Sequence, residues 1–258
     1  GTGPFTILLN YTLPTIEKEP IVIDATTQPG YSPGNPQIIV DGQYKHITGF
    51  YFNNIKNSGV SGIYFKHFIS QAVLINNSAL FNINNCYFTE IGNTDSKIKP
   101  AVIRAVSSSD GNILGNSIGM DPQGNVIGND AFGIIVSDKS VSNTIGGTNS
   151  GESNTIVKSM NIGVWITKES FYNKISGNII YEQDYAVVLE GGGNEYKHAP
   201  TIKDYNPIDG VLKGISEPND IIEIFGSTGQ ENANEYLGTV TADGSGEWSY
   251  TIPNLQYT

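Results

Sequence analysis

A short apolar motif recurs along most of the chain at nearly constant spacing. Its first and third positions are apolar in every copy, and the copies begin at residues 50, 73, 103, 134, 164 and 187. Successive copies therefore start 23, 30, 31, 30 and 23 residues apart. A unit this short cannot bury an apolar face by itself, so a fold built from such units must stack them against one another.

Two further apolar positions follow the first five copies of the motif. One lies ten or eleven residues after the start and the other five residues later, with the fourth unit displaced by an insertion. The residues at these positions are Val60, Ile83, Ile113, Ile145 and Ile175, then Phe65, Phe88, Ile118 and Ile180. Each unit therefore has three short strands. Layers about 4.8 Å apart would share one core, which predicts an all-β fold that begins with a parallel β-helix of three-strand coils.

The stretches between these strands have the composition of loops and tight corners. The longer units carry their extra residues in the polar segments GNTDSKIKP and MDPQGNVIGND, which we interpret as loops. No intervening segment has a 3.6-residue apolar period long enough for the helix of a βαβ crossover. Gly177 and Asn178 supply a corner at which a positive φ is tolerated, and Asn side chains stacked at such corners would bind backbone groups.

Charge and cysteine content exclude several classes of protein. The net charge is −11 and Arg104 is the only arginine, whereas nucleic-acid binding needs clustered Lys and Arg. The single cysteine, Cys86, rules out an internal disulfide framework and is expected to be a small core residue. No apolar run reaches the roughly 18 residues that span a bilayer, so we expect no membrane insertion. The start GTGPFTILLN has neither an initiator Met nor a signal-peptide pattern, so we expect a mature form or an excised fragment.

Four segments resemble a known family. They are LPTIEKEPIVIDATTQPGYSPGNPQIIVDG, GVSGIYFKHF, ILGNSIGMDPQGN and NTIGGTNSGESNTI. Together they look like the right-handed parallel β-helix repeat domains of large secreted and surface proteins of bacteria. In that family the Thr-Gln-Pro-Gly-Tyr stretch caps the first coils, and Gly-Asn-x-Ile-Gly-x-Asp is a recurring pattern, as at residues 115–121 here. The resemblance spans roughly residues 3–190. It implies a right-handed β-helix at an extracellular or cell-surface location, without a shared catalytic site.

The pattern changes after EGGGNEYKHAP. Five alternating strands follow, joined by hairpin turns such as the one at residues 243–246. This part resembles a bacterial immunoglobulin-like (Ig-like) domain, with Trp248 in its core. We therefore expect a β-helix domain at 1–195 and an Ig-like β-sandwich domain at 196–258. Such a sandwich has about seven strands, so we expect a truncated one that further Ig-like domains or a partner strand complete.

The predicted register places outward-facing side chains in rows along the coils. Tyr64 and Tyr87 would stack on one row, and Arg104 and Trp165 would lie on another. None of the outward positions predicted on the three strands is Asp or Glu, so a catalytic carboxylate pair has no place on the strands. Aromatic rows with polar groups suit sugar rings, which makes these four residues a candidate glycan face. The alternative is that loops cover the rows and turn them into a second core.

A second group of candidate ligands lies in the loop MDPQGNVIGND. Its side-chain oxygens would suit a calcium ion, although their spacing matches no EF-hand, and the alternative is a solvated acidic turn. The residues concerned are Asp121, Asn125, Asn129 and Asp130. We expect no other cofactor. The three histidines have no metal-type spacing with one another or with the cysteine, so we interpret them as surface or structural residues; they are His46, His67 and His198.

These features favour a non-catalytic extracellular module of a larger bacterial surface or secreted protein, which serves adhesion or glycan binding. Its expected partner is a polysaccharide or a cell-surface glycan. Two alternatives remain open. One is a polysaccharide lyase or glycoside hydrolase with acidic residues on its loops, and the other is a purely structural stalk without a ligand.

Overall fold

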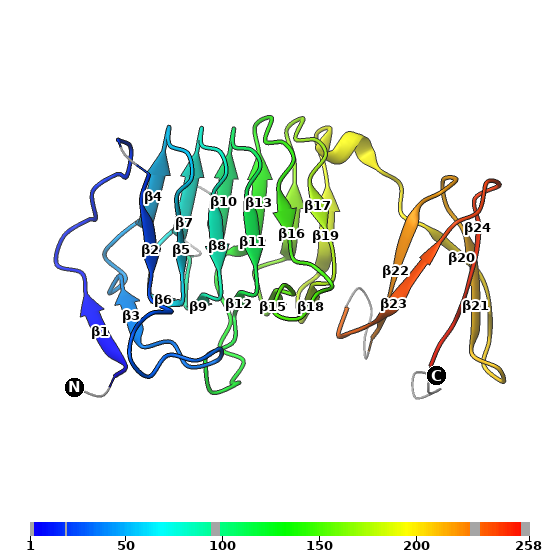
Figure 1. The fold of residues 1–258 in the computed structure, drawn as a ribbon, viewed down its shortest axis with the longest axis horizontal. Coiled ribbons are helices and arrows are strands. Elements are labelled where there is room, and N and C mark those ends of the chain that lie inside the picture. The colour runs from blue at the N-terminus through cyan, green and yellow to red at the C-terminus, as the bar shows by residue number, and fades with distance from the viewer. Residues whose placement is uncertain (1–2, 19, 94–98, 228–232, 254–258) are drawn as a thin grey trace.

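The computed structural model describes residues 3–18, 20–93, 99–227 and 233–253, and within them the chain is all-β, as predicted. Figure 1 shows a stack of strands that is followed by a smaller unit at the C-terminal end. The helix among the described residues is the 3-10 turn η1 (Gly193–Tyr196). No described helix is therefore long or apolar enough to cross a membrane.

Nineteen strands precede η1 and form three parallel sheets. Sheet 1 contains β4 (Thr48–Asn53), β7 (Gln71–Asn76), β10 (Ala101–Val106), β13 (Phe132–Ser137), β16 (Ile162–Ile166) and β19 (Tyr185–Leu189). Sheet 2 contains β2 (Val22–Asp24), β5 (Gly59–Ser61), β8 (Asn82–Asn84), β11 (Asn112–Leu114), β14 (Thr144–Ile145) and β17 (Lys174–Ile175). Sheet 3 contains β1 (Phe5–Leu8), β3 (Ile38–Asp41), β6 (Ile63–Lys66), β9 (Tyr87–Thr89), β12 (Ser117–Ile118), β15 (Thr155–Val157) and β18 (Ile179–Tyr181).

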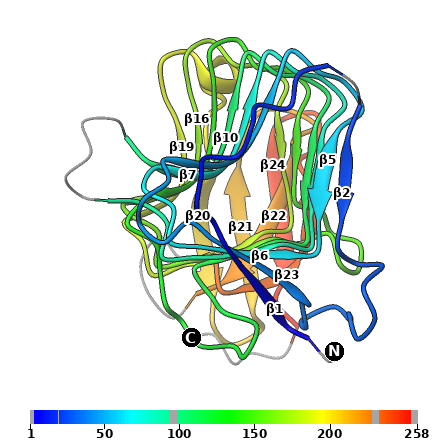
Figure 2. The ribbon, with the colours of Figure 1, turned by 90° about the vertical axis from the view of Figure 1, so that its left-hand side faces the viewer.

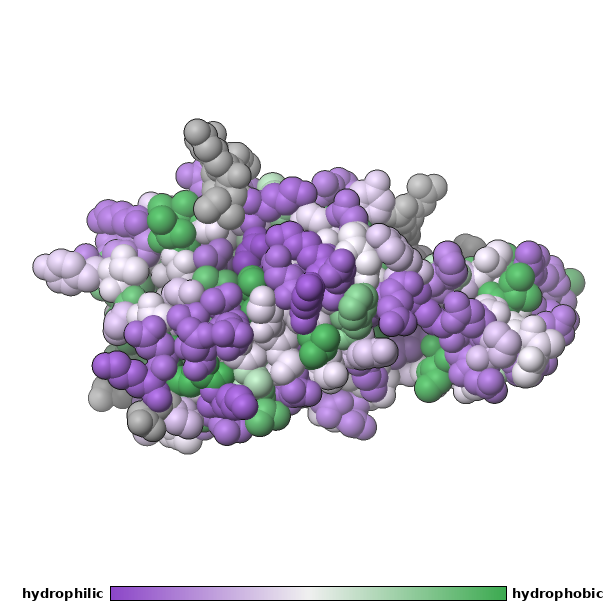
Figure 3. Space-filling view, turned by 90° about the horizontal axis from the view of Figure 1, so that it is seen from above, coloured by the Kyte–Doolittle hydropathy of each residue, from purple (hydrophilic) through white to green (hydrophobic). Residues whose placement is uncertain are grey.

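From β4 onward, the chain visits sheets 1, 2 and 3 in turn, and we call each such pass a coil. Seen along the stack in Figure 2, successive coils follow nearly the same outline. Three parallel sheets connected in this way are consistent with the predicted parallel β-helix. The face seen from above in Figure 3 is mostly hydrophilic, with hydrophobic residues in small scattered groups.

The interior consists of columns of apolar side chains that run through the coils. Val73, Ile103, Ile134 and Val164 pair in register and are fully buried, which confirms the predicted column of sheet 1. The predicted residues of sheets 2 and 3 pair in register in the same way. In the fourth unit, where an insertion lengthens the sequence before sheet 3, Ile156 occupies the equivalent position and pairs with Ile118 and Ile180. These columns remove continuous apolar surface from water, and burial of this kind is the main stabilising contribution to such a fold.

The corner between sheets 2 and 3 holds a ladder of buried side chains. Asn116, Asn154 and Asn178 stack there, and each side-chain oxygen accepts a hydrogen bond from the backbone N–H of the equivalent residue one coil earlier. Cys86 heads this ladder and is fully buried, as predicted. Gly177 has the positive φ expected at this corner, 62°. Because the amide groups satisfy buried backbone donors and acceptors, the ladder determines the path of the corner in each coil.

Five strands follow η1 and form two antiparallel sheets, which we call the C-terminal unit. One sheet has the order β20 (Thr201–Asn206), β21 (Val211–Ile215) and β24 (Glu247–Thr251), and the other pairs β22 (Ile221–Gly226) with β23 (Glu235–Thr241). The sheets share a core of Ile222, Ile224, Ala242 and Trp248. All five strands lie where the sequence predicts them, and Trp248 is buried as expected. The arrangement is consistent with an Ig-like sandwich.

Candidate functional site

The predicted outward row of sheet 1 is covered by other parts of the chain. Trp165 is only 8% exposed and belongs to a second hydrophobic cluster that includes Phe132 and Ile135. The ammonium of Lys99 lies 4.3 Å from the Trp165 ring centroid, and the Lys99 carbonyl accepts a hydrogen bond from Arg104. This is the second core that the sequence left open as an alternative to an exposed glycan face. Residues 94–98 of the preceding loop lie outside the described part of the chain.

Tyr64 and Tyr87 pair in register on sheet 3, as predicted. Their rings meet edge to face, with centroids 6.2 Å apart and planes at 70°, rather than stacked. Tyr64 is 8% exposed, and its hydroxyl is within 2.8 Å of the Thr89 hydroxyl. Burial raises the pKa of Tyr64 above its usual value, and the hydrogen bond with Thr89 only partly offsets this. The structure therefore leaves Tyr87 as the more accessible of the two rings, on a different sheet from Trp165.

Of the four predicted calcium ligands, the structure brings Asp121 and Asn125 into direct contact. Asp121 closes a hairpin turn, because its carboxylate accepts hydrogen bonds from the backbone N–H groups of Gln123 and Asn125 and from the Asn125 side chain. Burial alone would raise the pKa of Asp121, but these hydrogen bonds lower it overall. The side-chain oxygen of Asn129 points inward and accepts a hydrogen bond from the Ile91 N–H. Asp130 is exposed, next to the recess described below.

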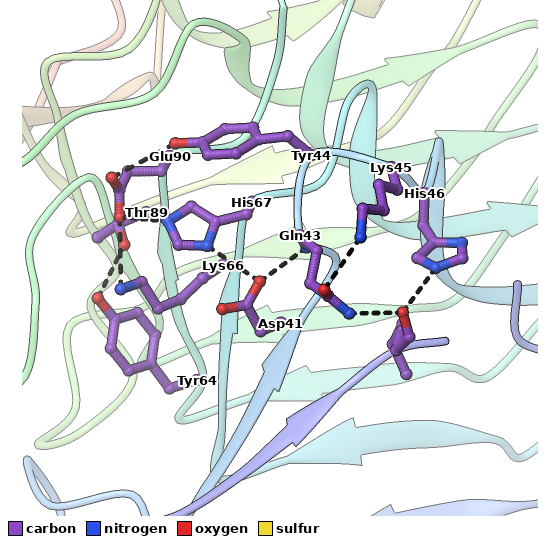
Figure 4. Close-up of polar contacts among 11 residues, drawn as sticks. Asp41, Gln43, Tyr44, Lys45, His46, Tyr64, Lys66, His67, Thr89 and Glu90 are labelled. Carbon is purple, nitrogen blue, oxygen red and sulfur yellow. Dashed lines mark hydrogen bonds and ion pairs between the residues drawn. The ribbon is translucent and has the colours of Figure 1, made fainter. Parts of the chain in front are cut away.

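A cluster of titratable groups that the sequence did not predict lies at the corner after sheet 3 (Figure 4). The imidazole of His67 sits between two carboxylates: its Nδ1 is 2.9 Å from Asp41, and its Nε2 is 3.0 Å from Glu90. The ammonium of Lys66 lies 3.5 Å from the same Glu90 oxygen. The side chains of Asp41, His67 and Glu90 are half-buried, with exposed fractions of 15%, 19% and 34%. Water therefore screens these charges only in part.

The stacking of the coils brings this cluster together. Strands β3, β6 and β9 are neighbours in sheet 3, and Asp41, Lys66 and Thr89 end them at the same level. His67 and Glu90 come directly after these strand ends, and both have a positive φ, 58° and 57°. The same turn therefore occurs at this corner in successive coils, which places the two side chains one above the other.

Tyr44 covers this cluster on the outer side. Its ring centroid is 4.5 Å from that of His67, and its hydroxyl is 3.4 Å from a Glu90 oxygen. Burial, and then the charge of Glu90, raise the pKa of the Tyr44 phenol. The residue is nevertheless 55% exposed. One face of its ring is therefore supported by the protein, and much of the side chain remains open to solvent.

A recess of about 330 Å³ opens beside Tyr44. Its lining combines the aromatic ring and apolar side chains with carboxylates and an ammonium group: Tyr44, Glu90, Ile127, Asp130, Lys158 and Met160. Among the described residues, the exposed side chains of Asp130 and Lys158 have no hydrogen-bond or salt-bridge partner. The recess thus offers a negative and a positive group that are both free to bind a ligand.

The spacing of the residues contained a signal for this site. His67 and Glu90 are 23 residues apart, which equals the length of the short repeat unit. Two polar residues one unit apart, each directly after a strand of the same sheet, are expected to lie in contact. Tyr44 and Asp130 come from a turn and an insertion that follow no constant period, so the repeat does not predict their positions, whereas Lys158 directly follows β15 at the same corner of a later coil. No protein-family model matches the chain, and no curated protein is similar enough to count as a relative.

Proposed function

We propose that this chain is a non-catalytic carbohydrate-binding module of a larger extracellular bacterial protein. In this proposal the parallel sheets form a right-handed β-helix, and an Ig-like domain follows it. The recess beside Tyr44 is the observation on which the glycan site rests. The resemblance of the sequence to β-helix domains of secreted and surface proteins supports the location.

The chemistry of the recess suits a sugar ring. A pyranose presents apolar C–H groups on one face and hydroxyls around its edge, so it is complementary to an aromatic ring with polar groups beside it. Tyr44 offers such a ring, while Asp130 accepts and Lys158 donates hydrogen bonds. The volume of about 330 Å³ is at the lower end for ligand pockets and fits one or two sugar units.

The surroundings of the recess keep these groups in place before a ligand binds. His67 and Glu90 support the Tyr44 side chain through the ring contact and the hydroxyl. Asn129 and Ser159 belong to neighbouring coils whose backbones pair with each other. A site on a rigid scaffold loses less conformational entropy on binding, which favours affinity for weakly binding ligands such as glycans.

Glycan binding by the full chain is the first test. An array of neutral, acidic and amino-sugar glycans identifies a ligand, and titration calorimetry then gives the affinity of the variants. We expect Tyr44→Ala and Asp130→Asn each to weaken binding by about tenfold or more. Tyr172→Ala is the matched control, because this tyrosine is 74% exposed and does not line the recess. An array without any bound glycan would refute the proposal and favour the structural stalk.

Polysaccharide cleavage is the second candidate function. Glu90 and Asp130 line the same recess, and glycoside cleavage commonly uses two carboxylates. Incubation with polysaccharides, followed by assays for new reducing ends and for unsaturated products, tests this function. If products form and Glu90→Gln and Asp130→Asn both abolish them, the module is an enzyme. Binding without any product supports the non-catalytic function.

The partner of the C-terminal unit also belongs to this proposal. Strand β20 is at the edge of its sheet, and Ile202 on it is 62% exposed. An edge strand of this kind can accept a further strand through its free backbone groups. A further Ig-like domain or a partner strand would pair there and complete the sandwich.

A further inference from the structure

We propose that the C-terminal unit is the end cap of the stacked coils, and that Glu223 replaces the coil that would otherwise follow. A stack of coils has unpaired backbone groups at its last coil, which must bind water or another part of the protein. The contacts made by this coil point to a specific replacement. This inference is independent of the proposed glycan site.

The backbone at the corner after sheet 2 carries the first part of the argument. At this corner an N–H group in each of three coils donates a hydrogen bond to a carbonyl of the next coil. The pairs are Gly62 to Asn84, Asn85 to Leu114 and Gly115 to Glu152, at 3.0–3.1 Å. In the last coil the equivalent N–H belongs to Gly177, and it donates instead to a carboxylate oxygen of Glu223 at 2.8 Å. The Ser176 hydroxyl donates to the other oxygen of the same carboxylate.

The strand of sheet 3 in the last coil is also paired by the C-terminal unit. Ile180 donates its N–H to the carbonyl of Ala233 at 2.9 Å and accepts the N–H of Ala233 at 2.7 Å. This is an antiparallel bridge, whereas sheet 3 itself is parallel. The C-terminal unit therefore supplies hydrogen-bond partners where the next coil would have supplied them.

The geometry of β22 explains why Glu223 reaches the coils. Side chains alternate along a strand, and Ile222 and Ile224 point into the core of the C-terminal unit. Glu223 therefore points to the opposite face, toward the last coil. Lys197, in the connection after η1, binds Glu217 and Asp220 just before this strand. It thereby ties the connecting segment to the unit that carries Glu223.

The contact depends on a few polar groups rather than on close packing. A cavity of about 550 Å³ lies between the last coil and the C-terminal unit, and Ile175, Leu189, Phe225 and Glu223 are among the residues that line it. Since little apolar surface is packed at this place, removal of the carboxylate is expected to release the local contact without unfolding either part.

Amide hydrogen exchange of the full chain, resolved by residue, tests the cap. In Glu223→Ala we expect exchange at Gly177 to be at least about tenfold faster, because its N–H loses a charged partner. Glu223→Gln keeps an acceptor oxygen and should show a smaller increase. Exchange at Gly115, which binds a carbonyl of a following coil, should stay unchanged. Glu247→Ala, at an exposed position of the same unit, is the matched control.

Two results would overturn the inference. Unchanged exchange at Gly177 in Glu223→Ala would show that the carboxylate is not its partner in solution. An equal increase at Gly177 and Gly115 would show that the substitution loosens the whole stack rather than its end. If Glu223→Ala does not fold, Glu223→Gln decides by the same comparison.

Discussion

The side-chain amide of Asn154 donates a hydrogen bond to the side-chain oxygen of Asn178 in the next coil, at 2.8 Å. Both residues are buried, with exposed fractions of 0% and 3%. The same amide also donates to the backbone carbonyl of Ile113, and the Asn154 oxygen accepts two hydrogen bonds from Asn116. One side chain therefore connects three coils.

Asn154→Ala is expected to destabilise the fold by about 3 kcal/mol or more. The substitution leaves the buried N–H of Asn116 without a partner, which costs about 1–3 kcal/mol, and it removes one of the two hydrogen bonds at the Ile113 carbonyl and at the Asn178 side-chain oxygen, at about 0.5–1.5 kcal/mol each. Urea unfolding measures the loss. Asn149→Ala is the control, because the Asn149 side chain is exposed and binds only Glu152; its effect should stay within about 0.5 kcal/mol. Similar losses in the two variants would contradict the role of the ladder.

The second hydrophobic cluster leads to a prediction about Trp165. Trp165→Ala should lower the free energy of unfolding by about 3–5 kcal/mol, since a large buried side chain leaves a cavity. Trp165→Phe should cost much less and should leave glycan affinity unchanged, because the ring is covered. Thermal unfolding and calorimetry measure the two effects. A marked loss of affinity in the folded Trp165→Phe protein would restore the row of sheet 1 as the glycan face.

The cluster at Asp41, His67 and Glu90 leads to a prediction about Tyr44. In His67→Ala both carboxylates lose their contact with the imidazole, and the Tyr44 ring loses its support. Because the cluster is half-buried, we expect the free energy of unfolding to fall by about 1–2 kcal/mol, with weaker binding of any glycan found in the array. His198→Ala, at an exposed position away from the cluster, serves as the comparison. If the two variants have the same stability and the same glycan affinity, His67 does not hold the Tyr44 ring in place.

The stability of the fold should fall with pH above about 8 because of Cys86. Burial raises the pKa of its thiol from 9.0 to about 12. The folded state therefore keeps its proton at a pH at which the unfolded chain has lost it, so ionisation favours unfolding between pH 9 and pH 12. From pH 8 to pH 10 this amounts to about 1.4 kcal/mol.

The variant Cys86→Ala isolates this contribution. Other groups titrate in the same way in both proteins, so the difference between their free energies of unfolding should decrease by about this amount from pH 8 to pH 10. Denaturant unfolding at several pH values gives the two curves. Parallel curves would show that the thiol does not remain buried and neutral.

The sequence repeat predicted which side chains fill the interior of the stacked coils and which of them pair between neighbouring coils. Val73, Ile103, Ile134 and Val164 were expected in one column, and they pair in that order. Asn178 was expected at a corner where Asn side chains stack, although the sequence did not show that Asn154 continues this ladder across the insertion. Such features are visible in a sequence because each coil repeats the same local arrangement, and only apolar side chains fit the shared interior.

The sequence by itself thus determined the all-β class, the inward columns and the places of most strands from residue 48 onward. The tertiary structure alone decided which outward side chains remain accessible: Trp165 is buried with Lys99 over its ring, whereas Tyr44 remains exposed. It also decided how Glu223 meets the last coil, because that contact occurs once and joins two parts with unrelated patterns. Periodic features follow from local sequence, whereas single contacts depend on where each irregular segment comes to lie in space.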